Sequence, residues 1–303
     1  MKEELAPVIL FVYNRLEHTK RTINALKENY YAEDSELFIY SDGAKDDSHK
    51  EKVEAVRRYV HQVDGFRRVH IIERTENYGL ARSIVEGVSE VIEKYGKIIV
   101  LEDDLITDKC FLRYMNEGLS KYKNNKKIYS ITGYSYLPNQ QKDQNVFFLG
   151  ITSSWSWGTW QDRWCEYNFS YDEWIKMKKN RGLRKAFDYG YAYPFYTLLK
   201  NQIEDEKTNS WAIIWYWTVF CAGGLTIYPP MTLINNVGFD GSGEHCTVQR
   251  RNSIEKDMGE TITWEFGNEC IEKQEMKRKV VREIRGQLSV WEKILLIKEV
   301  IGL

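Results

Sequence analysis

Four short apolar runs, separated by segments whose apolar residues have helical spacing, constrain the fold of this 303-residue chain more than any other feature. The runs are 8–13, 37–40, 69–72 and 98–101. Each is rich in β-branched or aliphatic residues and too short for a helix, which is typical of a strand buried on both faces. A strand and a helix recur about every thirty residues, which indicates consecutive βαβ units. We therefore expect an α/β fold with a mostly parallel sheet.

Polar residues follow each predicted strand. The four clusters are Tyr13-Asn14-Arg15, Ser41-Asp42-Gly43, Asn77-Tyr78-Gly79 with Arg82, and Glu102-Asp103-Asp104. Because the carboxyl ends of parallel strands line one crevice, all four should face the same ligand site. An aromatic ring can stack on a base, a carboxylate can accept hydrogen bonds from a base or ribose, and an arginine can bind phosphate. Ordinary turn chemistry is the alternative for each cluster taken alone.

Three consecutive carboxylates, Glu102, Asp103 and Asp104, close the fourth run. They repel one another unless a cation joins them. Carboxylate oxygens suit Mg²⁺ or Mn²⁺, and a diphosphate can fill the remaining coordination positions. The alternative is an acidic turn in which Asp104 or Asp108 caps a helix that begins near Cys110. The residues alone leave both interpretations open.

Composition excludes several classes of protein. The 43 basic and 44 acidic side chains nearly cancel, so no overall positive field draws the chain to nucleic acid. Five widely spaced cysteines without a CxxC pair argue against a disulfide framework or a zinc site. The first residues do not resemble a signal peptide, and no segment reaches the roughly 18 to 20 apolar residues of a membrane span. We expect reduced thiols and a cytoplasmic protein.

The series PVILFVYNR, YSDGAKDD, ENYGLARS and VLEDDL resembles the nucleotide-sugar-binding half of GT-A-fold glycosyltransferases. It is similar to bacterial family 2 enzymes, and the acidic triplet is also similar to that of N-acetylglucosaminyltransferase I. The resemblance implies a Rossmann-like, mostly parallel sheet flanked by helices. We expect a nucleotide-sugar-binding half (1–135), an acceptor-binding half with a closing loop (136–246) and a C-terminal helical extension (247–303).

The same resemblance implies a donor site built from all four clusters. The expected nucleotide-sugar-binding residues are Tyr13, Arg15, Asp42, Arg82, Glu102 and Asp103. Asp42 would bind the base or ribose, Arg82 would lie near the nucleotide, and Asp103 would face the ribose or sugar. Asp104 would bind Mn²⁺ or Mg²⁺. A UDP-sugar is the favoured donor.

Residues 235–246, NNVGFDGSGEHC, predict a flexible loop, because three glycines with Asp240 and Ser242 suit neither a helix nor a central strand. Backbone N–H groups in such a loop can bind an anion, and a neutral His245 can bind a metal. The loop resembles the one that closes over the diphosphate in GT-A enzymes, which implies that His245 joins Asp104 on the metal. A solvated histidine is the alternative.

Aromatic residues concentrate in the second half, where eight of the ten tryptophans lie between Trp155 and Trp217. Aromatic faces bind the apolar faces of sugar rings. Trp155 and Trp157 stand in a Ser/Gly-rich stretch that predicts a loop, and we expect them to contact the acceptor together with Trp211. Trp215 is expected in the core instead.

Several carboxylates are candidates for the catalytic base. An inverting transferase needs a carboxylate that takes the proton of the acceptor hydroxyl. In the enzymes that this chain resembles, an aspartate lies beside a tryptophan or a second acid at a helix start. The comparable stretch here, NSWAIIWYW, has Ala212 at that position. The remaining candidates are Asp205, Glu206 and Asp240, followed by Glu204 and Asp162, and any of them could be a solvated surface charge.

The C-terminal part is predicted to be helical. Residues 272–285 contain six basic and three acidic side chains, and residues 288–303 are apolar with scattered charges. One interpretation is a helix packed on the catalytic domain. The other is an amphipathic helix that docks on an anionic membrane or a partner enzyme, which would place the protein at the inner face of the membrane.

These features predict a metal-dependent, inverting hexosyl- or N-acetylhexosaminyltransferase that uses a nucleotide diphosphate donor and a saccharide or lipid-linked acceptor in polysaccharide assembly. A non-catalytic carbohydrate-binding protein on the same scaffold is one alternative, which Ala212 favours. A sugar-phosphate nucleotidyltransferase is another. That class should carry a glycine-rich basic loop after the first strand, and YNRLEHTK contains no glycine.

Overall fold

The computed structural model describes residues 4–137, 144–241 and 263–301. Within these ranges the chain forms ten strands and eleven helices. The strands are β1 (Val8–Val12), β2 (Glu36–Ser41), β3 (Arg68–Glu73), β4 (Lys97–Glu102), β5 (Leu105–Thr107), β6 (Ile128–Thr132), β7 (Phe147–Leu149), β8 (Trp157–Trp160), β9 (Leu225–Tyr228) and β10 (Ile234–Asn236). The helices are α1 (Leu16–Lys27), α2 (Asp47–Val60), α3 (Gly79–Tyr95), α4 (Phe111–Lys121), α5 (Gln161–Trp164), α6 (Tyr171–Lys179), α7 (Arg181–Phe187), α8 (Phe195–Ile203), α9 (Trp211–Cys221), α10 (Gln274–Gln287) and α11 (Val290–Ile301).

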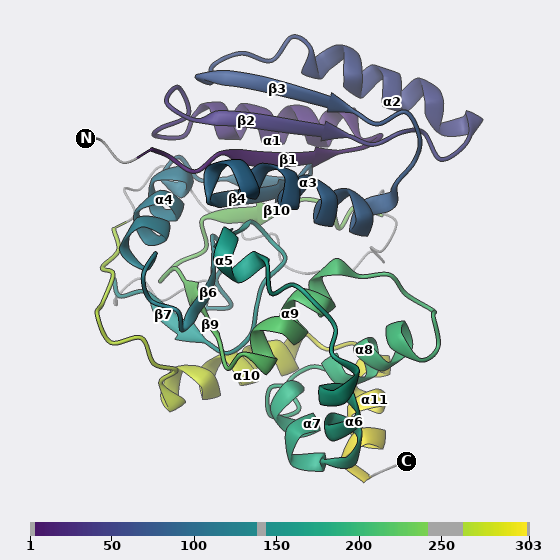
Figure 1. Ribbon diagram of the computed structural model, residues 1–303, viewed down its shortest axis with the longest axis vertical. Coiled ribbons are helices and arrows are strands. Elements are labelled where there is room, and N and C mark those ends of the chain that lie inside the picture. The colour runs from purple at the N-terminus through teal and green to yellow at the C-terminus, as the bar shows by residue number, and fades with distance from the viewer. Residues whose placement is uncertain (1–3, 138–143, 242–262, 302–303) are drawn as a thin grey trace.

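An eight-stranded sheet in the order β3-β2-β1-β4-β8-β6-β9-β7 runs through the molecule (Figure 1). Strands β3, β2, β1 and β4 are parallel to one another. Strand β8 is antiparallel to both β4 and β6, and β9 is parallel to β6. All four predicted apolar runs form strands, and the predicted α/β class with a mostly parallel sheet is confirmed.

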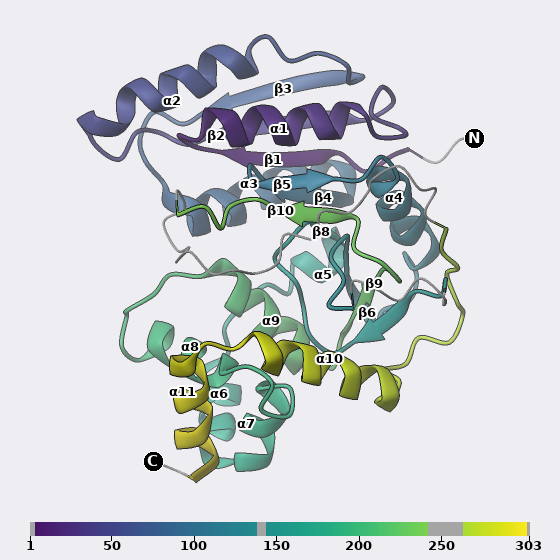
Figure 2. The ribbon, with the colours of Figure 1, turned by 180° about the vertical axis from the view of Figure 1, so that it is seen from behind.

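Helices cover both faces of the sheet because alternate residues of each strand point to opposite sides. On β1, Val8, Leu10 and Val12 pack into a core with α1, α2 and α4. Ile9 and Phe11 pack on the other side with α3 and α9. Figures 1 and 2 show α3 and α1 on opposite faces of β1. A strand covered on both faces has no solvent side, which explains why this run carries no polar residue.

The stretch around Trp157 departs from the sequence-based expectation. Trp157–Trp160 form β8, a buried central strand, and the irregular segment before it ends at Ser156. Gly158 explains how the strand fits, since a Cβ atom there would lie 2.8 Å from the carbonyl oxygen of Ile98. The small residues that suggest a loop therefore allow β8 to approach β4 closely.

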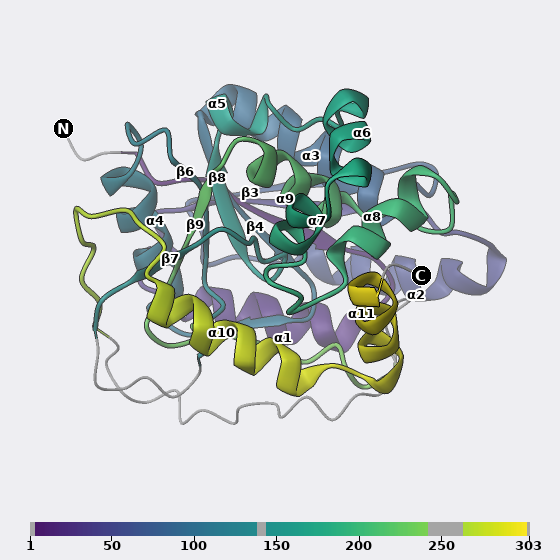
Figure 3. The same cartoon turned by 90° about the horizontal axis from the view of Figure 1, so that it is seen from below.

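A third hydrophobic core forms where helices α6 to α10 pack against β7 and β9. Trp217 is 1% exposed at its centre, and Val280 and Ile284 anchor α10 against it. Figure 3 shows α10 and α11 crossing this end of the molecule. Among the described residues, no helix combines the length and apolarity that crossing a bilayer requires.

Candidate functional site

The turn between β4 and β5 holds two of the predicted acids against the start of α1. Arg15 Nη2 lies 3.0 Å from Asp104 Oδ2 and also forms an ion pair with Asp103. Thr22 Oγ1 donates a hydrogen bond of 2.8 Å to the carbonyl oxygen of Asp103. Because β1 and β4 are parallel neighbours, their carboxyl ends place Arg15 and both carboxylates at one edge of the sheet.

The electrostatics of this edge reflect partial exclusion of water. Desolvation raises the pKa of Glu102 to about 8, and the carboxylates of Asp104 and Asp103 add to the shift. Burial likewise raises the pKa of Asp103 to about 6, although Arg15 opposes the rise. Burial would lower the pKa of Arg15, but its two carboxylate partners raise it above the ordinary arginine value. The guanidinium therefore stays charged and partly neutralises the cluster.

Residues 234–240, from the second half of the chain, pack against this turn and are called the covering segment below. Strand β10 pairs antiparallel with β5, and the N–H of Val237 donates to the carbonyl oxygen of Asp104 at 2.9 Å. At Gly238 a Cβ atom would overlap Asp104 Oδ2, so only glycine fits here without displacing the carboxylate. His18 Nε2 on α1 lies 3.2 Å from Asp240 Oδ2. Asp240, predicted from the sequence, thus lies beside the acidic turn.

The carboxylates fit a divalent cation that takes most of its ligands from a phosphate. Within the described ranges, no three His, Cys, Asp or Glu side chains form a group that could hold a metal on their own. Mg²⁺ in phosphate sites is usually held by one or two carboxylates together with phosphate oxygens and water. Asp103 and Asp104 lie together at the turn and meet that requirement. The predicted ligand His245 lies outside the described residues.

Asp42 organises the neighbouring strand ends. Its carboxylate accepts hydrogen bonds from the N–H groups of Gly43, Tyr78 and Gly79 at 2.9, 2.8 and 2.9 Å. The side chain of Asn77 donates a further hydrogen bond of 3.2 Å. These contacts fix the start of α3, because they bind N–H groups that a helix leaves unpaired at its first turn. Base or ribose binding by Asp42 stays a prediction.

Tyr13 and Arg82 flank this arrangement. The Tyr13 ring stacks on His49 with ring centroids 5.8 Å apart, and its hydroxyl accepts the N–H of Lys45 at 3.0 Å. Arg82 lies over the Tyr78 ring, 3.7 Å from its centroid, and pairs with Glu86 at 2.7 Å. Arg82 is half exposed, so a ligand could reach it from solvent.

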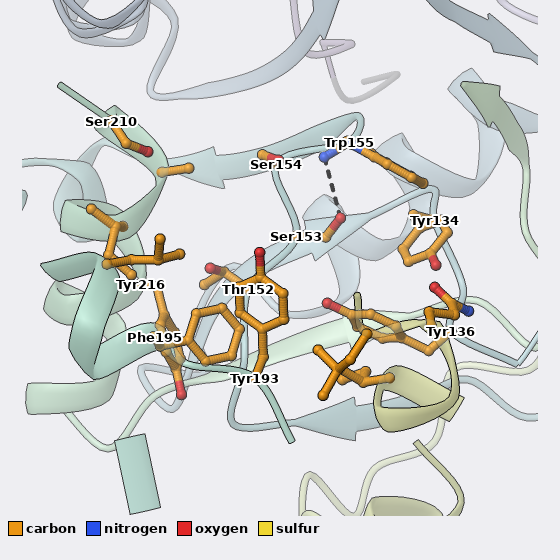
Figure 4. Close-up of a pocket in the computed structure, with 16 residues that line it drawn as sticks. Tyr134, Tyr136, Thr152, Ser153, Ser154, Trp155, Tyr193, Phe195, Ser210 and Tyr216 are labelled. Carbon is orange, nitrogen blue, oxygen red and sulfur yellow. Dashed lines mark hydrogen bonds between the residues drawn. The ribbon is translucent and has the colours of Figure 1, made fainter. Parts of the chain in front are cut away.

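A cavity of about 250 Å³ is lined mostly by residues from the second half of the chain, among them Trp155 (Figure 4). Its polar wall contains Tyr134, Tyr136, Thr152, Ser153 and Ser154, and its apolar wall includes Trp155, Phe195, Ile213 and Leu288. The Trp155 ring contacts Phe239, with centroids 5.6 Å apart. Since Phe239 stands between Gly238 and Asp240, this contact makes the cavity adjoin the acidic turn.

The other predicted residues lie elsewhere. Trp157 and Trp211 are 1% and 4% exposed, stack on each other in the core between α3 and α9, and do not line the cavity. Asp205 pairs with Lys207 at 2.9 Å, and Glu206 is exposed beside it. Ala212 does line the cavity, which is where the expected acid is missing. The acceptor and base roles predicted for these residues remain untested.

Two residues of the site, His18 and Gly238, were not predicted from the sequence. His18 lies in the first turn of α1, just after Arg15, and its closeness in sequence to the predicted Arg15 was the available signal. Gly238 has no sequence signal that separates it from its neighbouring glycines. The capping alternative is not confirmed, because Cys110 is the N-cap of α4 and no side chain of the described residues caps the helix; Asp108 Oδ1 accepts the N–H of Cys110 at 2.8 Å in the turn before it. Asp104 instead pairs with Arg15.

One comparison with known proteins identifies the family. The family model for glycosyl transferase family 2 matches residues 8–174, which confirms the resemblance at the level of the family. A mannosyltransferase from Pyrobaculum calidifontis, solved with GDP-Man and Mn2+, is 13% identical, with 72% of this chain and 74% of that chain covered and a TM-score of 0.37. S. aureus TarS 1-349 is 11% identical, with 76% and 59% covered and a TM-score of 0.41. No curated protein matches the chain.

Replacing Gly238 with alanine tests the contact between the covering segment and Asp104. The added methyl group must displace the carboxylate or the segment, and overpacking of this kind costs about 1–3 kcal/mol. We expect Gly238→Ala to weaken nucleotide-sugar binding about tenfold or more in calorimetry. Gly267→Ala is the matched control, because a Cβ atom there meets nothing within 4 Å. Equal affinities of the two variants would contradict the assignment.

Proposed function

The chain belongs to glycosyl transferase family 2, and we propose that it transfers a sugar from a nucleoside diphosphate to a saccharide or lipid-linked acceptor in polysaccharide assembly. The proposal rests on the contact between two neighbouring sites. The cluster of Arg15, Asp103 and Asp104 at the carboxyl edge of β1 and β4 adjoins an aromatic, hydroxyl-lined cavity through Phe239 and Trp155. A donor diphosphate at the first site and an acceptor in the second would meet at the covering segment.

On the donor side, Arg15 would bind a diphosphate oxygen, since its guanidinium is held charged at the cluster. Asp104, with Asp103, would hold Mn²⁺ or Mg²⁺, which when bound would neutralise charge on the leaving diphosphate. Tyr13, with Arg82, would contact the nucleoside, and a UDP-sugar carrying a hexose or an N-acetylhexosamine is the donor we favour. Asp42 supports this side by fixing the start of α3.

On the acceptor side, Trp155 offers a ring face to the apolar side of a sugar, and the hydroxyl groups of Ser153 and Tyr134 can bind its polar edge. The described lining of the cavity includes no carboxylate. The base must therefore come from its rim, and Asp240 is the candidate that follows Phe239 directly. The acceptor oxygen would bond to the anomeric carbon as the bond to the diphosphate breaks, and Asp240 would take the hydroxyl proton.

A carbohydrate-binding protein without turnover is the second candidate. Ala212 favours it, because this residue lines the cavity at the helix start where an acid was expected. Such a protein would keep the donor and acceptor contacts and lack the proton transfer. The two functions differ in whether nucleoside diphosphate is released.

The direct test is release of nucleoside diphosphate from a panel of nucleotide sugars with Mn²⁺ and with Mg²⁺. We expect slow release by the wild type and a loss of at least about a hundredfold in Asp240→Asn, the lower end of the typical contribution of a general base. Asp64→Asn, whose carboxylate forms an exposed ion pair with Lys27 away from the acidic turn, is the matched control. Binding without release from any donor would support the carbohydrate-binding alternative, and formation of nucleoside triphosphate from pyrophosphate would contradict both.

Trp155 tests the acceptor site separately. Trp155→Ala removes the ring from the cavity wall, so the acceptor KM should rise about tenfold, since the roughly 0.5–1.5 kcal/mol of an aromatic pair corresponds to a change of up to about tenfold. Donor affinity should stay within about twofold, because the ring does not touch the acidic cluster. Trp155→Phe should recover most of the acceptor affinity. A parallel loss of donor and acceptor affinity would rule out the acceptor assignment.

A further inference from the structure

We propose that the face formed by α6, α7, α10 and α11 docks on the surface of an anionic lipid bilayer. The four helices lie together at the end of the molecule opposite β3 and α2 (Figures 1 and 3). This surface is distinct from the acidic turn, and nothing in the proposed glycosyl transfer requires it.

Helix α11 presents apolar side chains to solvent along one face. Val290, Trp291 and Ile297 are 76%, 64% and 56% exposed, and Ile294 continues the same stripe. Residues 290, 294 and 297 are four and three positions apart, so they share a helix face, whereas Leu296 is buried against the protein. An exposed tryptophan among aliphatic residues suits the boundary between lipid headgroups and acyl chains.

Two neighbouring helices also expose apolar side chains. Arg181 at the start of α7 donates a hydrogen bond to the carbonyl oxygen of Val300, which joins α7 to the end of α11. On α6 and α7, Ile175 and Leu183 are also exposed, at 44% and 37%. Exposed apolar residues on adjoining helices mark a surface that binds something, because single apolar residues on a protein surface are normally scattered.

The charge of the four-helix face indicates which partner binds it. The four helices carry thirteen basic and six acidic residues in sequence, although the whole chain has a formal net charge of −1. Two of the basic residues, Lys178 and Lys277, also pair with Glu204 and Glu272 outside these helices, so an excess of positive charge remains. Residues 174–187 contain six basic residues and no acidic one. A second copy of this chain would bring the same positive surface and repel it. Anionic headgroups complement the charge while the acyl region accepts the apolar stripe.

The cavity lies at the edge of this face. Leu288 lines it and stands just before α11, and Ile284 and Gln287 of α10 line it as well. Docking through α11 would therefore bring the cavity next to the bilayer, where a lipid-linked acceptor presents its sugar. This orientation rests on the proposed function, whereas docking itself does not.

Co-sedimentation with vesicles tests the docking, in the absence of any nucleotide sugar. Vesicles of phosphatidylcholine with about one third phosphatidylserine should bind the wild-type protein at least roughly tenfold more tightly than phosphatidylcholine alone, and added salt should weaken the binding. The double variant Trp291→Ala and Ile297→Ala should lose about tenfold or more, because it removes apolar groups that enter the bilayer. Tyr30→Ala is the control, since Tyr30 is 46% exposed in the segment between α1 and β2.

Two charge-reversing substitutions distinguish electrostatic docking from adsorption through apolar residues alone. Lys179→Glu with Lys185→Glu should weaken binding to anionic vesicles, and Lys52→Glu on α2 should leave it unchanged. Circular dichroism verifies that each variant is folded. Equal binding to neutral and anionic vesicles, or a dimer in sedimentation velocity that the Trp291 and Ile297 changes dissolve, would overturn the proposal. Release of nucleoside diphosphate in vesicle-free solution reports separately on the proposed function.

Discussion

The ion pairs between Arg15 and the two aspartates of the β4–β5 turn connect the parts of this molecule on which its chemistry depends. Arg15 precedes α1, and Asp103 and Asp104 follow β4, so the pairs join two carboxyl strand ends that are distant in sequence. Two carboxylates this close in a largely buried position repel each other, and desolvation raises that cost. One guanidinium reduces the repulsion without removing it, which leaves an edge that still favours a further cation and its phosphate ligands.

The second half of the chain completes this edge. Strand β10 returns to pair with β5, and Gly238 lets the backbone pass directly over Asp104. The same segment carries Phe239 toward Trp155 and places Asp240 beside His18. The acidic edge and the cavity therefore contact one short segment, whose position depends on the β5–β10 pair.

The fold was largely predictable because burial on both faces of a parallel strand leaves a continuous apolar run. The acidic turn was predictable for a related reason, since acids directly after such a run must lie at the carboxyl edge. Trp157 was misplaced because Gly158 indicates a loop locally, whereas in the fold it permits close contact between strands. The contact of His18 with Asp240 spans residues far apart in sequence, and no local pattern reports it. Trp211, expected to contact the acceptor, is instead buried in the core, and no local pattern distinguishes it from a surface aromatic residue.

The central claim is that Asp104 binds the donor through a divalent cation, and titration calorimetry with nucleoside diphosphates, UDP first, tests it most directly. The wild type should bind at least about tenfold more tightly with saturating Mn²⁺ than with a chelator. Asp104→Asn should bind in Mn²⁺ no more tightly than the wild type binds in chelator. Unchanged affinity of Asp104→Asn relative to the wild type under both conditions would contradict the account, because the acidic turn would then play no part in holding the donor.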